Sequence, residues 1–259
     1  MKFLRFKKRG KIKTGYLKGE EIIETSFPIL DALKSPEKAF KSSIQSFLKE
    51  EVQILSPVIP SKIICVGLNY RDHARELNME IPEEPIIFMK PPSGIIGQED
   101  EIIYPQTSQE VDYEAEMAII ISDKAKNVTS TGAVDFIGGY TAMNDVTARD
   151  IQRKDGQWTR AKSFDTFCPL GPCIETEMDP DNQNISLKLN GEFKQNSNTK
   201  NMIFKVSDLV EFISDAMTLN PGDVIATGTP PGVGQMYPGD SVQVQIEDIG
   251  ILENKVIKY

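Results

Sequence analysis

The feature that most constrains the fold of this chain is that its apolar residues come in short runs separated by turn-forming residues. The 259 residues include 18 glycines and 16 prolines, which favour turns and interrupt helices. The runs KIICVGLNY, PIIFMK and DYEAEMAIIIS have the length and composition of strands. One segment, VSDLVEFISDAMTL, has apolar residues at helical spacing, with Ser207 placed as its N-cap. The sequence therefore predicts a mainly β protein (α+β) with few helices.

Pro57 and Pro60 mark a crossing point that divides the chain. We expect a small N-terminal domain over residues 1–56 and a larger domain over residues 57–259. The first part begins with the strand-like pieces MKFLRF, KIKTGYL and GEEIIET, and a polar amphipathic segment follows. In the second part, Asn190-Gly191 separates two strand-like runs, and this dipeptide favours a β-hairpin.

Composition and charge exclude several classes of protein. The net charge of −9 argues against a broad nucleic-acid surface, and no apolar run approaches the ~18 residues of a membrane span. The basic start MKFLRFKKRGKIK continues into further charges rather than an apolar core, so we expect a solvated edge strand and not a signal peptide. The three cysteines (Cys65, Cys168 and Cys173) are too few and too irregularly spaced for a disulfide framework, which favours buried thiols in the cytoplasm.

Two glutamates in one apolar strand provide the first candidate site. Glu114 and Glu116 lie two residues apart in VDYEAEMAIIIS, so their side chains are expected on one face of a strand. Neighbouring carboxylates repel each other unless a cation or a proton lies between them. Asp145, at the end of another strand, could join them as an oxygen ligand of Mg²⁺. The alternative is a pair of half-exposed strand residues.

The second candidate is His73, which is the only histidine in the chain. It lies at the start of a helical segment, and Glu76 follows three residues later, where it can hydrogen-bond the imidazole. This arrangement is typical of a general base. The alternative is an exposed helical histidine that has a glutamate nearby by chance.

Four further residues are candidates for substrate contacts. Lys162, in RAKSFD, could bind a carboxylate or an enolate, or it could be a surface lysine. Arg149 and Gln152 could line the same site as Asp145, or they could lie on a solvated helix face. The segment GTPPGVG lacks the features of a phosphate-binding loop. Its Thr229 hydroxyl could hold a carboxylate, or the segment could be an ordinary turn.

From Ser61 to Val256 the chain resembles the fumarylacetoacetate hydrolase family. The resemblance rests on the order of these segments: CVGLNYRDHARE, IIFMKPPSGIIG, VDYEAEMAIII, GGYTAMNDVTARDIQ, RAKSFDTFCPLGP, LNPGDVIATGTPPGVG and YPGDSVQVQIEDIG. It implies a mixed β-sandwich roll and a homodimer that takes a small-molecule 2-oxo acid. It also implies these roles: Mg²⁺ or Mn²⁺ on Glu114, Glu116 and Asp145; a base dyad of His73 and Glu76; Lys162 facing the substrate; and contacts from Arg149, Gln152 and Thr229.

The sequence departs from the longer members of the family in one respect. Those members have an additional acidic ligand before the histidine, whereas IICVGLNY contains no acid. The three-carboxylate site is more similar to that of acylpyruvases, oxaloacetate decarboxylases and hydroxymuconate-type isomerases. The expected activity is hydrolysis of a C–C bond in acylpyruvates through a metal-stabilised pyruvate enolate. Decarboxylation, isomerisation or hydration, ureidoglycolate cleavage and non-catalytic binding remain alternatives.

Overall fold

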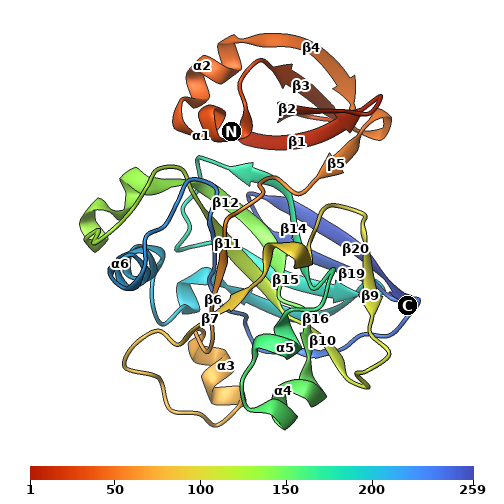
Figure 1. The fold of residues 1–259 in the computed structure, drawn as a ribbon, viewed down its shortest axis with the longest axis vertical. Helices are drawn as coiled ribbons and strands as arrows, with labels where there is room; N and C mark the ends of the chain where they lie inside the picture. Colours follow the sequence, from red (N-terminus) through yellow and green to blue (C-terminus); the bar gives the residue numbers. More distant parts are fainter.

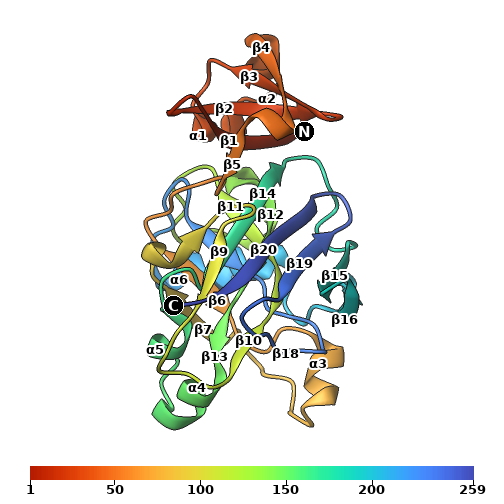
Figure 2. The same ribbon diagram turned by 90° about the vertical axis from the view of Figure 1, so that its right-hand side faces the viewer.

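The computed structural model describes residues 1–259 and shows a mainly β protein with mixed sheets, as predicted (Figures 1 and 2). The strands are β1 (Lys2–Lys8), β2 (Lys11–Lys18), β3 (Glu21–Thr25), β4 (Ser43–Leu48), β5 (Gln53–Leu55), β6 (Ile63–Val66), β7 (Ile87–Lys90), β8 (Ile95–Ile96), β9 (Glu101–Tyr104), β10 (Val111–Tyr113), β11 (Ala115–Ile121), β12 (Ile137–Asn144), β13 (Thr147–Ala148), β14 (Cys168–Glu175), β15 (Asn184–Leu189), β16 (Glu192–Asn198), β17 (Val224–Ala226), β18 (Gly234–Gln235), β19 (Ser241–Ile246) and β20 (Gly250–Lys258). The α-helices are α1 (Ile29–Lys34), α2 (Pro36–Lys41), α3 (Arg71–Glu76), α4 (Arg149–Asp155), α5 (Thr159–Lys162) and α6 (Val206–Ala216). None of the helices has both the length and the apolar character that crossing a membrane requires.

One long sheet runs through the molecule in the order β4-β3-β2-β1-β14-β12-β11-β17-β6-β7. The N-terminal strands form a layer above the main body (Figure 1) and join it where β1 pairs with β14. The expected boundary after residue 56 falls in the connection between β5 and β6, and the division into two domains remains a proposal. A second sheet, β16-β15-β19-β20-β9, packs against the long sheet and encloses the main core.

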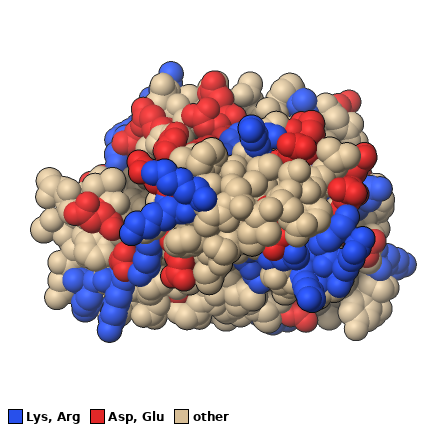
Figure 3. Space-filling view, turned by 90° about the horizontal axis from the view of Figure 1, so that it is seen from above, with Lys and Arg blue, Asp and Glu red and all other residues tan.

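The expectation that the basic N-terminal segment is an edge strand is wrong. β1 lies between β2 and β14, and Phe3, Leu4 and Phe6 are fully buried. These apolar side chains pack against the protein on both faces of the strand, so only the charged residues between them reach solvent. Figure 3 shows basic and acidic side chains interspersed on this end of the molecule, and Lys13 pairs with Glu24 at 2.6 Å. This end of the molecule therefore has no uniformly basic patch.

Local sequence signals are mostly confirmed. β15 and β16 form the predicted hairpin, and Asn190 and Gly191 have the positive φ values (53° and 84°) that its turn requires. The three cysteines are free and buried. The predicted amphipathic helix is α6, but the N-cap assignment to Ser207 is wrong. Lys205 is the N-cap, and the Asp208 carboxylate accepts its backbone N–H at 3.0 Å.

A buried aspartate fixes the two parallel strands that lead to the candidate site. Asp223, just before β17, is fully buried. It accepts hydrogen bonds from the Ser61 hydroxyl (2.6 Å), the Ser61 backbone N–H (3.1 Å) and the Asn220 backbone N–H (2.7 Å), and it pairs with Lys62. Residues 61 and 62 precede β6, which pairs in parallel with β17. Asp223 therefore sets the register of the strands that end near His73 and Thr229.

Replacement of Asp223 should destabilise the protein strongly. Asp223→Ala leaves the Lys62 ammonium and several backbone groups without a partner, so the free energy of unfolding should fall by about 3–5 kcal/mol. Asp123→Ala is the matched control, because Asp123 forms an exposed pair with Lys34 and should cost less than about 1 kcal/mol. Urea denaturation measures both values. Equal losses in the two variants would contradict the anchoring role of Asp223.

Candidate metal centre and active site

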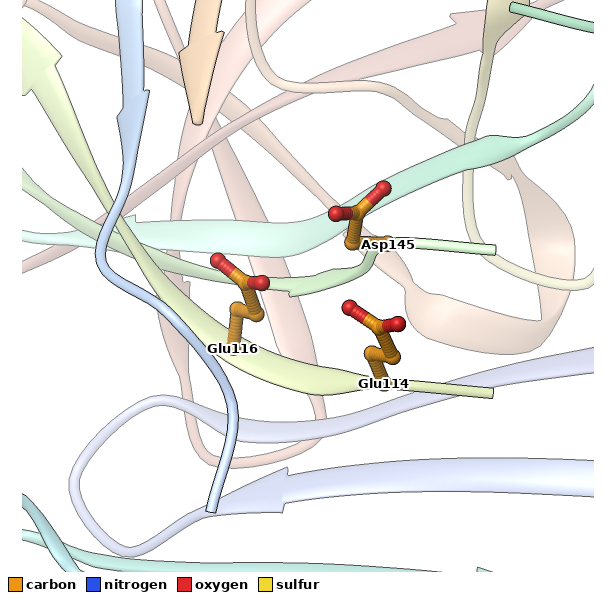
Figure 4. Close-up of side chains that lie close together, drawn as sticks. All are labelled: Glu114, Glu116 and Asp145. Carbon is orange, nitrogen blue, oxygen red and sulfur yellow. The ribbon is translucent and has the colours of Figure 1, made fainter. Parts of the chain in front are cut away.

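Three acidic side chains, those of Glu114, Glu116 and Asp145, lie close together (Figure 4). Glu116 lies on β11, Glu114 precedes that strand, and Asp145 follows β12. Because β11 and β12 are antiparallel neighbours that pair Ala115 with Asn144, the ends of the two strands bring the acids together. A carboxylate oxygen from each acid lies within 4.8 Å of the others, and all three residues are buried. Two carboxylates at this separation repel each other by about 3 kcal/mol at an effective dielectric constant near 20.

Three cations offset much of this repulsion. The Lys162 ammonium bridges Glu114 Oε2 at 3.0 Å and Asp145 Oδ2 at 2.6 Å. Lys90, at the end of β7, donates to Asp145 Oδ1 at 2.6 Å and to the Val146 carbonyl at 3.0 Å. Arg149 pairs with Glu114 and with Asp112, which is also buried. Sequence reasoning missed Lys90 and Asp112, although a lysine directly after the apolar run PIIFM was a usable signal.

Glu116 is the acid without a cationic partner. The only hydrogen bond that its carboxylate accepts comes from the Gly228 backbone N–H, at 2.8 Å. Burial raises the pKa of Glu116 well above its usual value, and the charges of Asp145 and Glu114 add to this effect. Burial also raises the pKa of Glu114, but Lys162 and Arg149 outweigh burial and lower it to about 2.

The charge balance and the ligand types fit a divalent cation. Four carboxylates face three side-chain cations, so the cluster has one excess negative charge when every group is ionised, and Glu116 is the acid that remains unbalanced. A cluster of carboxylate oxygens is the donor set that hard cations such as Mg²⁺ and Mn²⁺ prefer. With such an ion the net charge becomes positive, which favours an anionic substrate.

His73 and Glu76 form the predicted contact on α3. His73 Nδ1 lies 2.7 Å from Glu76 Oε2, and Glu76 also accepts the Gly232 backbone N–H at 3.1 Å. A carboxylate at Nδ1 favours the tautomer with a proton on that nitrogen. Nε2 is then free to accept a proton from another group. The Gly232 contact ties the dyad to the loop that contains Thr229.

One cleft of about 600 Å³ brings the candidate residues together. Glu114 lines it, while Glu116 and Asp145 lie buried behind it. The sequence did not predict the apolar residues that line the cleft, which include Phe88 and Trp158, because apolar residues in a site follow no recognisable motif. The lining also contains all six residues predicted for catalysis or substrate contact: His73, Glu76, Arg149, Gln152, Lys162 and Thr229.

The chain belongs to the fumarylacetoacetate hydrolase family. The family model for the fumarylacetoacetate (FAA) hydrolase C-terminal domain matches residues 62–257. The predicted resemblance is therefore confirmed, and the chain is an enzyme of this family.

Named relatives catalyse different reactions. The chain is 61% identical to an uncharacterised protein of Methanocaldococcus jannaschii, covering 83% of this chain and 90% of the relative. It is 45% identical to a mitochondrial oxaloacetate tautomerase of Rattus norvegicus, covering 87% of this chain and 76% of the relative. The solved 5-carboxymethyl-2-hydroxymuconate delta-isomerase of Mycobacterium smegmatis is 39% identical with a TM-score of 0.89, covering 100% of both chains. A maleylpyruvate hydrolase of Sphingobium sp. SYK-6 is 28% identical with a TM-score of 0.85, also covering 100% of both chains.

Replacement of Glu116 should remove divalent-metal binding. Glu116→Gln keeps the shape of the side chain and its contact with Gly228 but removes the charge that lacks a partner. Affinity for Mn²⁺ should fall by more than the roughly 10- to 100-fold expected for a change outside the ligands, as measured by calorimetry. Glu110→Gln is the control, because Glu110 also lines the cleft but pairs with Arg153. Unchanged Mn²⁺ affinity in Glu116→Gln would refute the assignment of this ligand.

Proposed function

We propose that the protein is a Mg²⁺- or Mn²⁺-dependent tautomerase that interconverts the keto and enol forms of oxaloacetate-like 2-oxo acids. The observation that supports this most strongly is that Glu114 of the buried carboxylate cluster lines the same cleft as the His73–Glu76 dyad. Sequence analysis placed C–C bond hydrolysis first. The similarity to oxaloacetate tautomerases moves tautomerisation ahead, because it requires the same groups without an attacking water.

The side chains of the cleft have distinct parts in this chemistry. A divalent ion held by Glu114, Glu116 and Asp145 would supply Lewis-acid stabilisation of negative charge on the 2-keto oxygen. His73 Nε2 takes a proton from the carbon next to the keto group and returns it to the enolate oxygen, the reverse order gives the keto form, and Glu76 stabilises the imidazolium that forms in between. Lys162 stabilises the negative charge that develops on the enolate oxygen. Arg149 and Gln152 orient the substrate, and Thr229 contacts its carboxylate.

Hydrolysis of acylpyruvates is the second candidate. The cleft of about 600 Å³ has room for a longer acyl group and a water molecule, and a structural neighbour is a maleylpyruvate hydrolase. In this reaction His73 would take its proton from water, which then attacks the distal carbonyl. Decarboxylation, hydroxymuconate-type isomerisation and ureidoglycolate cleavage use similar groups and rank lower. A homodimer in the cytoplasm, without nucleic-acid or membrane partners, remains our expectation.

An absorbance assay should distinguish these reactions. The enol and keto forms of oxaloacetate differ in ultraviolet absorbance, so a tautomerase should accelerate their interconversion only when Mg²⁺ or Mn²⁺ is present. Product analysis should then find no more pyruvate from oxaloacetate than the metal ion produces without the protein. Pyruvate with carbon dioxide would show decarboxylation instead, and pyruvate released from acylpyruvates would show hydrolysis. No metal-dependent change with any of these substrates would contradict the proposed chemistry.

His73→Ala should separate catalysis from metal binding. Loss of the base should lower turnover by about 100- to 10,000-fold, while Mn²⁺ affinity stays at the wild-type value because His73 does not contact the acid cluster. Arg75→Ala is the control, since Arg75 lies exposed on the same short helix. If His73→Ala keeps wild-type turnover, the dyad does not take part in the reaction.

A further inference from the structure

A fully buried glutamine connects the acid cluster to the loop that contains Thr229. Gln195 lies on β16, and its side-chain oxygen accepts the Ala115 backbone N–H at 2.9 Å. Ala115 is the residue between the two glutamates of the cluster. The side-chain nitrogen of Gln195 lies 2.8 Å from the Thr229 hydroxyl oxygen and 2.8 Å from the Pro230 carbonyl oxygen.

These partners permit only one orientation of the Gln195 amide. The Ala115 N–H can only donate a hydrogen bond, and the Pro230 carbonyl can only accept one. A reversed amide would place two donors against each other and two acceptors against each other, at a high cost in the interior. The Gln195 nitrogen therefore donates one hydrogen to Pro230 and its other hydrogen to the Thr229 oxygen.

The fixed amide determines the hydrogen-bonding role of Thr229. Its hydroxyl oxygen accepts from Gln195, and this is its only hydrogen bond within the protein. Thr229 is nearly buried and lines the cleft, so its own hydrogen is left for a group in the cleft. A ligand with a carboxylate or carbonyl oxygen there would satisfy it, whereas an ammonium or a methyl group would leave a donor unpaired.

We infer that Gln195 is a positioning residue that commits the Thr229 hydroxyl to donate a hydrogen bond, so that the cleft selects ligands with an oxygen acceptor at this place. The inference rests on the proposed function, because it assumes that substrate lies beside Thr229. Gln195 touches neither the substrate nor the acids directly. It acts through Thr229, and its position on the distant β16 strand explains why no local sequence pattern indicates it.

Oxalate, a small dicarboxylate without reactive chemistry, provides a binding probe. Calorimetry with the Mn²⁺-loaded protein should show tight binding to the wild type and to Thr229→Ser, which keeps the hydroxyl. Thr229→Val has nearly the same shape without the donor and should bind about 10- to 100-fold more weakly, the range expected for a hydrogen bond to a charged group. Wild-type affinity in Thr229→Val would overturn the inference.

A double-mutant cycle tests the link from Gln195 to Thr229. In Gln195→Glu, one carboxylate oxygen can still accept the Ala115 N–H, while the other has no hydrogen to donate to the Thr229 hydroxyl or the Pro230 carbonyl. The loss of the Pro230 contact lowers stability, and the Thr229 hydroxyl then donates its own hydrogen to this carboxylate. Oxalate affinity should fall by about as much as in Thr229→Val, and addition of Thr229→Val to Gln195→Glu should change it by less than about twofold. Losses that multiply would show that Gln195 acts independently of Thr229 and would overturn the inference. If Gln195→Glu does not fold, Gln195→Met replaces it. Methionine removes the group that fixes the Thr229 hydroxyl without taking its hydrogen, so oxalate affinity should fall by less than in Thr229→Val, and an unchanged affinity would overturn the inference.

The outcomes also separate this inference from the proposed function. If the wild type binds Mn²⁺ but no oxalate, both the inference and the proposed function fail, because the cleft then does not bind a carboxylate ligand. If the wild type binds oxalate and all the variants match it, only the inference fails. In steady-state assays with oxaloacetate, Gln195→Glu should raise KM by about 10- to 100-fold and leave kcat nearly unchanged. A fall in kcat alone would point to damage to the acid cluster and would contradict a role through Thr229.

Discussion

The central constraint on the structure is the close approach of three buried carboxylates. Glu114, Glu116 and Asp145 repel one another, and the fold keeps them together by surrounding them with Lys90, Lys162 and Arg149. This compensation is incomplete, because Glu116 has only the Gly228 N–H as a partner. A buried carboxylate without a cationic partner lowers the stability of the fold, and such a cost is typical of a functional site. A divalent ion would remove that cost and would supply the electrophile for 2-oxo acid chemistry.

The loop over residues 228–234 connects the separate parts of the site. Its backbone donates to Glu116 at one end, through Gly228, and to Glu76 further along, through Gly232. Between these contacts Thr229 is fixed by Gln195. Glu116 of the acid cluster, Glu76 of the His73–Glu76 pair and Gln195 thus all contact one short segment. Asp223 fixes the start of β17, the strand that leads into this loop. Contacts of Asp223 therefore help to position the residues of the site.

The sequence predicts what depends on local pattern and misses what depends on tertiary contacts. Strand-like runs, the Asn190-Gly191 turn and the amphipathic helix follow from residue spacing, and the structure contains all three. The candidate site residues came from motifs in their order along the chain, and the cleft contains or adjoins all of them. Lys90 and Gln195 were missed because their partners lie 55 and 34 residues away. The central position of β1 was missed because its pairing with β14 leaves no local signal.

Anomalous scattering from crystals soaked in Mn²⁺ would show whether the three acids hold a metal ion. We expect one strong peak within about 2.0–2.4 Å of an oxygen from each of Glu114, Glu116 and Asp145. A peak elsewhere, or no peak at this cluster in metal-saturated crystals, would contradict the claim that these acids hold the ion on which the chemistry depends.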